Sequence, residues 1–244
     1  MGIMKMGIDI LIQTRDVDYN DIIKPTAILD LCQDLTGLHA DVIGIGYEEM
    51  KKQNYAWVVL YQHFEILKIP PYLETVHLDT WPKPKGRLEC EREFLMLDKD
   101  GTPLMKGISN WVIIDLTSRS LVRADKVNFN GEYYDFTNYP DKSKRRLNLD
   151  SSLIQETTEY RVLYDDLDHN GHMNNAKYMT AIMNFYSLYG QNKYVNEAEV
   201  SYVKEAKYGD IIKIGHYSVD GKEAFMGFID DELCFECLIG VKKI

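Results

Sequence analysis

The sequence predicts an α+β protein built from two similar halves, each with one central helix followed by antiparallel strands. Two observations support this prediction. The segments 16–20 and 166–170 share the pattern Asp-x-Asp-x-Asn, 150 residues apart. Each copy leads into apolar residues spaced three and four apart, the period of a helix, and then into strand-like runs. A helix that is apolar on one side and is followed by several strands is typical of a sheet packed against a helix.

The two expected helices begin at equivalent points. Pro25 aligns with Asn175, and proline is favoured at the first position of a helix. Asn174, directly before the second helix, is a good N-cap residue. The apolar faces consist of Ile28, Leu29, Cys32 and Leu35 in the first half and of Ala176, Met179, Ile182, Met183 and Tyr186 in the second.

Strand-like segments follow each helix. They are expected at 56–60, 75–78, 90–97 and 104–114, and again at 198–202, 211–217, 224–229 and 233–241. Hairpin turns are expected at 98–101 and 230–231, where Asp and Gly interrupt the apolar pattern. Cys234 and Cys237 lie in the last strand, and residues three apart in a strand face opposite sides. We therefore expect two buried thiols there, not a redox pair or a metal site.

The segment 122–155 interrupts the repeat and is rich in turn-forming residues. Its charge run, 142–146, is expected to be a solvated linker, with a docking patch for an acidic partner as the alternative. The chain is thus expected to comprise an N-terminal unit over 1–125, a connecting segment over 126–155 and a C-terminal unit over 156–244.

Composition narrows the classes of function. Apolar residues make up 45% of the 244 residues, enough for a sizeable core, and the net charge of −10 argues against nucleic-acid binding. No apolar run is long enough to insert into a membrane. The first residues lack the pattern of a secretory signal. With only four cysteines, this composition predicts a cytoplasmic protein.

The second copy of the repeat holds the candidate site. Asp168, Asn170 and His172 are spaced two apart, so in an extended segment they would share one side. They lie just before a helix, whose free N–H groups can polarise a carbonyl. His172 can donate a hydrogen bond or take up a proton near neutral pH. In the first copy the position of His172 is occupied by Ile22, so only the second half carries the full polar set.

Three simpler interpretations compete with a catalytic one. Asp166, Asp168, Asn170 and Gly171 match positions 1, 3, 5 and 6 of a calcium-binding loop, but position 12, which requires a bidentate Glu, is Lys177. A capped turn before a helix explains Asn174 but not His172. An isolated histidine satisfied by its neighbours is the third interpretation.

The stretch from Asp166 to Tyr178, DLDHNGHMNNAKY, resembles the signature of the acyl-acyl carrier protein (ACP) thioesterases, the plant plastid enzymes and their bacterial relatives. The first half also resembles that family at 21–25, 33–34, 37–40 and 44–47, so the similarity runs over nearly the whole chain. It implies a tandem (double) hot-dog fold, each half a long helix wrapped by an antiparallel sheet.

The resemblance also implies the roles of single residues. The Asp-x-Asn-x-His of the family falls on Asp168, Asn170 and His172, and its strand glutamate falls on Glu205. Plant members carry a cysteine directly after this glutamate. Ala206 stands there in this chain, so attack by water is expected instead of attack by a thiol.

The resemblance implies hydrolysis of fatty acyl-ACP to free fatty acid and carrier protein. The acyl group is expected at Asn174 and Asn175, with a chain pocket in the first half that includes Ile28, Cys32 and Trp57. No metal or cofactor is expected. The expected partner is acylated carrier protein, docked on basic residues at 83–87 or 142–146, and a homodimer is compatible with this expectation. An acyl-CoA thioesterase and a non-enzymatic acyl-binding or regulatory protein are the alternatives, whereas the Asp-x-Asn-x-His pattern argues against a dehydratase.

Overall fold

The computed structural model describes residues 2–141 and 145–244. It divides into two compact units, one comprising Met1–Ile23 and Asp30–Arg145, the other Lys24–Leu29 and Arg146–Ile244. The first turn of the first long helix therefore groups with the second unit. Within the described residues, no helix has the length and apolar character needed to cross a membrane.

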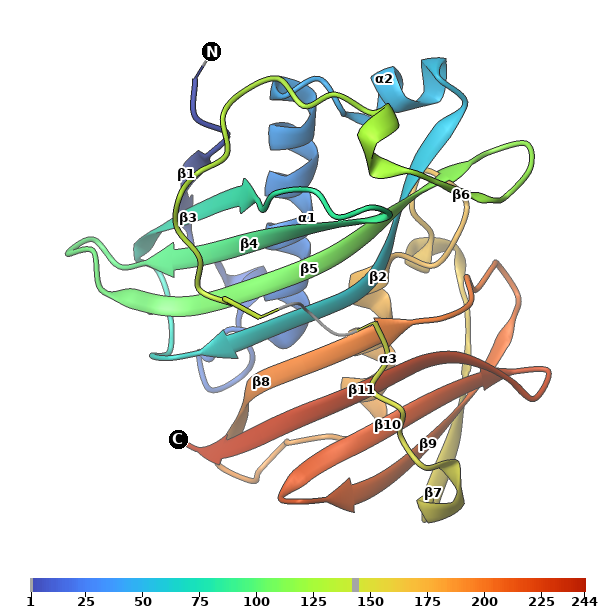
Figure 1. The fold of residues 1–244 in the computed structure, drawn as a ribbon. Helices are drawn as coiled ribbons and strands as arrows, with labels where there is room; N and C mark the ends of the chain where they lie inside the picture. Colours follow the sequence, from blue (N-terminus) through green and yellow to red (C-terminus); the bar gives the residue numbers. More distant parts are fainter. Residues whose placement is uncertain (1, 142–144) are drawn as a thin grey trace. The chain divides into compact units, whose positions relative to one another are not determined.

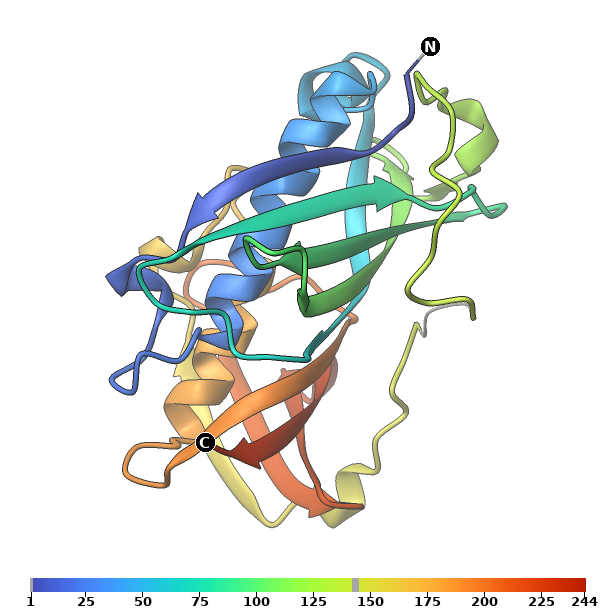
Figure 2. The same cartoon turned by 90° about the vertical axis from the view of Figure 1, so that its left-hand side faces the viewer.

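The first unit is one antiparallel sheet with a long helix along one face (Figure 1). The strand order is β1-β3-β4-β5-β2, and the short β6 pairs with β5. Figure 2, turned by 90°, shows α1 running along the sheet of this unit. The elements are β1 (Met6–Leu11), α1 (Pro25–Val42), α2 (Tyr47–Lys52), β2 (Tyr55–Ile66), β3 (Thr75–Pro82), β4 (Glu89–Leu97), β5 (Pro103–Asp115) and β6 (Leu121–Val122).

The second unit repeats this arrangement with a shorter helix. The strand order β7-β9-β10-β11-β8 matches that of the first unit strand for strand. The elements are β7 (Glu156–Arg161), α3 (Asn175–Phe185), β8 (Lys193–Tyr202), β9 (Ile211–Val219), β10 (Lys222–Ile229) and β11 (Glu232–Lys243). Two successive helix-and-sheet units confirm the predicted α+β class and the tandem hot-dog fold.

The repeat extends to single hydrogen bonds. In the first unit the N–H of Leu73 donates to Ile12 O at 3.0 Å, and in the second the N–H of Gly209 donates to Val162 O at 3.0 Å. A position before α1 in the first unit therefore corresponds to the position 150 residues later in the second unit. A position just before β3 corresponds to the position 136 residues later, just before β9.

The predicted strands are confirmed, although several are longer than expected, and the edge strands β1 and β7 and the two-residue β6 were not predicted. β1 and β7 consist of half-buried and exposed residues, and neither contains a continuous apolar run. The hairpin turns are confirmed: Asp98 accepts the N–H groups of Asp100 and Thr102 at 3.0 and 2.8 Å, and Asp230 and Asp231 both have positive φ. Cys234 and Cys237 are buried free thiols, as expected.

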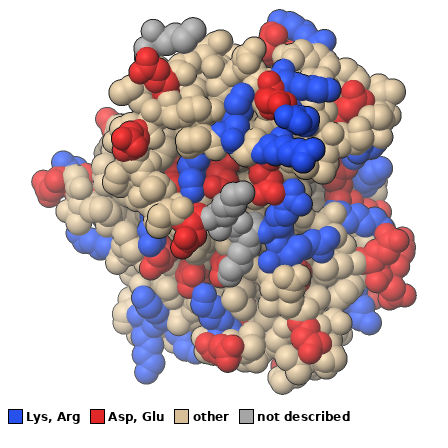
Figure 3. Space-filling model, viewed as in Figure 1, with Lys and Arg blue, Asp and Glu red and all other residues tan. Residues whose placement is uncertain are grey.

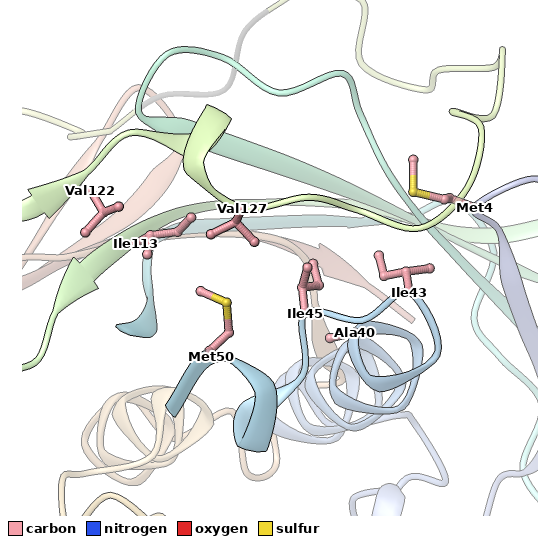
Figure 4. Packing of buried hydrophobic residues seen from close by; sticks show 8 residues of the cluster. All are labelled: Met4, Ala40, Ile43, Ile45, Met50, Ile113, Val122 and Val127. Atoms are coloured by element: carbon pink, nitrogen blue, oxygen red, sulfur yellow. The ribbon is translucent and has the colours of Figure 1, made fainter. Parts of the chain in front are cut away.

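An apolar cluster fills the space between the end of α1, α2 and β5 in the first unit (Figure 4). It consists of Met4, Ala40, Ile43, Ile45, Met50, Ile113, Val122 and Val127. Burial of one such side chain contributes about 1.5–3 kcal/mol. Burial of Met50 in this cluster explains why the unpredicted helix α2 forms although it has only six residues.

A buried polar pair lies deeper in the same unit. His39 on α1 and Arg92 on β4 are 1% and 5% exposed. The Arg92 guanidinium, which can only donate, contacts His39 Nδ1 at 2.8 Å and Thr80 Oγ1 at 3.2 Å. Burial, with the nearby Arg92 charge, lowers the pKa of His39 from 6.5 to about 4, and burial lowers the pKa of Arg92 to about 10.

The described parts of the connecting segment on either side of its charge run are partly packed against the sheets, and the expected solvated linker at 142–146 stays a prediction. The Trp81 indole N–H donates to Phe136 O at 3.0 Å, and buried Glu93 accepts the N–H of Asn138 at 2.6 Å. In the second unit, buried Glu236 accepts the N–H groups of Leu147 and Leu149 at 3.2 and 2.8 Å. Residues 142–144 of the charge run lie outside the described residues.

Candidate functional site

The polar stretch before α3 folds as a tight turn, so the expectation of an extended segment is wrong. Asp168 Oδ1 accepts the N–H groups of Asn170 and His172 at 2.8 and 3.2 Å, and the N–H of Asp168 donates to His172 O at 2.8 Å. Gly171 has φ +77°, a conformation that glycine adopts readily. The Asp168 carboxylate therefore shapes the backbone that presents His172.

The first unit contains the same turn without the histidine. Asp18 Oδ1 accepts the N–H groups of Asn20 and Ile22 at 2.8 and 3.1 Å. The repeat seen in the sequence is thus a repeat of this backbone structure. Because the turn forms with Ile22 as well as with His172, the imidazole is not needed to build it.

His172 and Glu205 are brought together in the second unit although 33 residues separate them. The distance from His172 Nε2 to Glu205 Oε2 is 3.4 Å, and the side chains are 25% and 33% exposed. Both are therefore accessible to water. Their backbones are aligned because His172 bridges to Lys207 and the N–H of Met173 donates to Ala206 O at 2.8 Å. A carboxylate beside an imidazole can take a proton from water and stabilise the imidazolium form.

Asn170 lies within the turn and contacts the carboxylate that shapes it. Its amide contacts Asp168 Oδ2 at 3.3 Å, and its side chain is exposed. The predicted set thus consists of two pairs, Asp168 with Asn170 and His172 with Glu205, joined through the backbone of the turn. The Asp168 carboxylate already accepts backbone N–H groups, and among residues 2–141 and 145–244 no group of His, Cys, Asp and Glu is placed to hold a metal ion.

The start of α3 lies directly after this turn. Asn174 is the N-cap, and its side-chain oxygen accepts the N–H of Ala176 at 2.9 Å, as predicted for a capping residue. Asn175 is the first helical residue, and its carbonyl accepts the hydroxyl of Tyr202 at 3.2 Å. The partial positive charge of the helix N-terminus therefore lies a few residues from His172.

Two tyrosines near this site were missed from the sequence. Tyr178 on α3 and Tyr202 on β8 have ring centroids 5.5 Å apart, edge to face. The Tyr178 hydroxyl accepts the N–H of Ala206 at 3.1 Å. Tyr178 is the last residue of the motif at 166–178, but its partner Ala206 follows 28 residues later, and no local pattern predicts that contact.

The residues expected to line an acyl pocket lie in different places. Ile28 and Cys32 are buried on α1, Ile28 in the turn that groups with the second unit and Cys32 in the first unit. Trp57 on β2 packs on the apolar cluster of the first unit, and its indole N–H donates to Ile45 O at 2.9 Å. These contacts also suit a core role, so a pocket role for the three stays a prediction.

The basic residues expected to dock a carrier protein are partly engaged. Lys83 is 15% exposed, pairs with Glu91 at 3.0 Å and donates to Tyr139 O at 2.7 Å. Lys85 donates to Val127 O at 2.6 Å. Both contact the connecting segment, and a docking role for the basic residues at 83–87 stays a prediction. Over the first unit, Figure 3 shows Lys and Arg side chains with Asp and Glu side chains among them.

The fold and the site define a double hot-dog protein with a carboxylate–imidazole pair in its second unit. Comparison with known proteins then gives the family. Residues 6–128 match the acyl-ACP thioesterase N-terminal domain, and residues 151–231 match the acyl-ACP thioesterase C-terminal domain. The chain belongs to the acyl-ACP thioesterase family.

Individual relatives agree with this assignment. The chain is 23% identical over 222 residues to the chloroplastic oleoyl-acyl carrier protein thioesterase of Coriandrum sativum, covering 83% of this chain and 59% of that one. A palmitoyl-acyl carrier protein thioesterase of Arabidopsis thaliana is 29% identical over 154 residues, covering 59% and 37%. The chain spans about half the length of the curated relatives it matches.

Solved structures share the whole fold. An acyl-ACP thioesterase from Bacteroides thetaiotaomicron superposes with a TM-score of 0.85 at 22% identity, covering 98% of both chains. The 12:0-ACP thioesterase from Umbellularia californica gives a TM-score of 0.86 at 22% identity, covering 98% and 97%. At this identity the likeness establishes the fold.

Proposed function

We propose that the protein hydrolyses the thioester of a fatty acyl chain carried by acyl carrier protein, releasing the free fatty acid and the carrier thiol. The observation that carries this proposal is the pair of His172 and Glu205, 3.4 Å apart and both accessible to water, beside the start of α3. Membership of the acyl-ACP thioesterase family supports the substrate class.

In the proposed reaction Glu205 is the general base. It takes a proton from water, and the oxygen of that water attacks the acyl carbonyl carbon. The new C–O bond forms while the C=O π electron pair moves to the carbonyl oxygen. This oxygen faces the N–H groups at the start of α3 near Asn174 and Asn175. The C–S bond then breaks, and the proton returns to the thiolate. His172 and Asn170 orient the thioester and the water, and Asp168 holds the turn that presents them.

Water attack suits this chain better than thiol attack. Ala206 follows Glu205, so no cysteine is available at that position. Cys234 contacts the residue directly before Glu205: its Sγ donates to Lys204 O at 3.1 Å, and the side chain is buried. Burial raises the pKa of Cys234 to about 12, so it stays a thiol at neutral pH. A buried thiol with a raised pKa is a poor nucleophile.

Release of free thiol from a panel of fatty acyl-ACP and acyl-CoA substrates tests the proposal. We expect Glu205→Gln to lower turnover by about 10²- to 10⁴-fold, the usual contribution of a general base. Glu159→Gln, which alters an exposed glutamate on β7 of the same unit, is the matched control and should leave turnover unchanged. Near-normal turnover by Glu205→Gln would contradict the assignment.

The same panel separates the alternatives. Faster turnover of acyl-CoA than of acyl-ACP would favour an acyl-CoA thioesterase, and tight binding of acyl chains without thiol release would favour an acyl-binding or regulatory protein. The acyl pocket of Ile28, Cys32 and Trp57 belongs to this proposal, as does the division into an acyl-binding N-terminal unit and a catalytic C-terminal unit. A cytoplasmic location and a homodimer also stay predictions, the latter testable by light scattering of the purified chain.

A further inference from the structure

Tyr178 connects α3 to the chain segment that carries Glu205. Its side chain is 3% exposed and packs edge to face against Tyr202 and Phe235, with ring centroids 5.5 and 5.4 Å away. Its hydroxyl accepts the N–H of Ala206, the residue directly after Glu205, at 3.1 Å. The hydroxyl thus fixes the peptide bond from which the Glu205 carboxylate extends.

The first unit shows what this segment does without a tyrosine. After β2 and after β8, two consecutive N–H groups donate to a single carbonyl oxygen at nearly the same distances. These donors and acceptors are Leu67 and Lys68 with Leu104 at 2.8 and 3.1 Å, and Val203 and Lys204 with Cys234 at 2.9 and 3.1 Å. The two segments therefore share one backbone structure, with corresponding positions 136 residues apart.

Neither partner of the Tyr178 hydrogen bond exists in the first unit. The position that corresponds to Tyr178 is Ile28, which has no hydroxyl. The position that corresponds to Ala206 is Pro70, which has no N–H. The paired N–H contacts of Leu67 and Lys68 form there without the bond. Since those backbone contacts do not require the bond, they do not by themselves explain its presence in the second unit.

What distinguishes the second unit is the carboxylate. Ile69 occupies the position that corresponds to Glu205, and Ile22 the position that corresponds to His172. The tyrosine hydroxyl and its N–H partner therefore occur in the unit that has the carboxylate–imidazole pair, and are both replaced in the unit that lacks it.

We propose that Tyr178 is a positioning residue for Glu205, which it holds at the distance and orientation needed to act with His172. This inference rests on the proposed function. Tyr178 does not touch the substrate in this role; it acts through the backbone of Ala206. Burial raises the pKa of Tyr178 well above its ordinary value, so the phenol stays neutral and keeps this hydrogen bond across the working pH range.

Tyr178→Phe tests the inference because it removes only the hydroxyl. We expect kcat for acyl thioester hydrolysis to fall about 10- to 100-fold, as is typical when a reacting group is misplaced by a fraction of an ångström to 1 Å, with KM changed less than about threefold. Tyr217→Phe is the matched control. Tyr217 is also buried in the second unit, and its hydroxyl accepts the N–H of Asp150 at 3.0 Å, the same kind of bond far along the chain from the site.

The two variants should lower the thermal midpoint by similar amounts, but only Tyr178→Phe should lower kcat. Ala206→Pro removes the same hydrogen bond from the donor side, and proline occupies the corresponding position of the first unit, Pro70. It should reproduce the loss of kcat, and it carries the test alone if Tyr178→Phe does not fold. Equal kcat in Tyr178→Phe and Tyr217→Phe would overturn the inference.

Combination with Glu205→Gln separates the inference from the proposed function. If Tyr178 acts through Glu205, Tyr178→Phe should cause no further loss in the Glu205→Gln background, since the group it positions is already inactive. A further tenfold loss in that background would mean that Tyr178 acts on something else. Unchanged turnover in Glu205→Gln itself would instead refute Glu205 as the general base, and absence of thiol release by the native chain would refute the proposed function.

Discussion

Acid should destabilise this protein through His39. Burial, with the nearby Arg92 charge, lowers the pKa of His39 in the folded chain from 6.5 to about 4. As the pH falls below 6.5, the unfolded chain takes up a proton at His39 that the folded chain accepts only near pH 4, so the free energy of unfolding decreases across this window. The full difference of about 2.5 pKa units corresponds to about 3.4 kcal/mol, of which about 2 kcal/mol is lost by pH 5.

Urea unfolding of the native chain and of His39→Asn at pH 8, 7 and 5 measures this effect. Asparagine places an acceptor close to the position of Nδ1, so the contact with Arg92 is retained while the titrating group is removed. Between pH 7 and 5 the native chain should lose about 2 kcal/mol more than the variant. Between pH 8 and 7 both should change equally. Equal losses down to pH 5 would refute the reasoning.

Three further predictions concern the turn, the helix start and the second sheet. Asp168→Ala and Asp18→Ala each remove a carboxylate that accepts two backbone N–H groups, so each should lower the free energy of unfolding in urea by about 1–3 kcal/mol. Only Asp168→Ala should slow thiol release. Equally slow release by Asp18→Ala would show that the turn does not act locally. Asn174→Ala removes the N-cap hydrogen bond of α3 and should lower the free energy of unfolding by about 1 kcal/mol, whereas Asn174→Ser should retain most of that stability. An unchanged unfolding midpoint for the alanine variant would contradict the capping role. Gly227→Ala would place its Cβ 2.1 Å from the ring of Phe235, so it should destabilise the second unit by about 1–3 kcal/mol. Thermal unfolding would detect this loss. An unchanged thermal midpoint would show that the ring moves aside without cost.

The part of the fold that the sequence predicts is the part specified by local patterns. The turn at Asp168 and its copy at Asp18 are each built within five residues, so their repeat is visible as a repeat of letters. The apolar periods of the helices and the central strands are equally local. β1 and β7 were missed because an edge strand with one half-exposed face lacks a continuous apolar run, as the sequence ETTEYR of β7 illustrates.

The candidate site was only partly accessible from the sequence, because its contacts join distant segments. His172 stands in a motif, whereas Glu205 was reached through the family resemblance and Tyr178 was not reached at all. The contacts of Lys83 with the connecting segment could not be predicted either, for a similar reason. Glu93 is fully buried beneath the connecting segment, and Lys83 lies 3.7 Å from it, a relation that no local pattern encodes.

The carboxylate of Glu236 has a consequence for how this chain can change in evolution. It accepts the main-chain N–H groups of Leu147 and Leu149, and the leucine side chains take no part in these two hydrogen bonds. Any residue except proline offers the same N–H, so substitutions at 147 and 149 keep both hydrogen bonds. Substitution of Glu236 would leave two donors without their acceptor at once. Among related sequences, residues 147 and 149 should therefore vary widely while position 236 stays acidic.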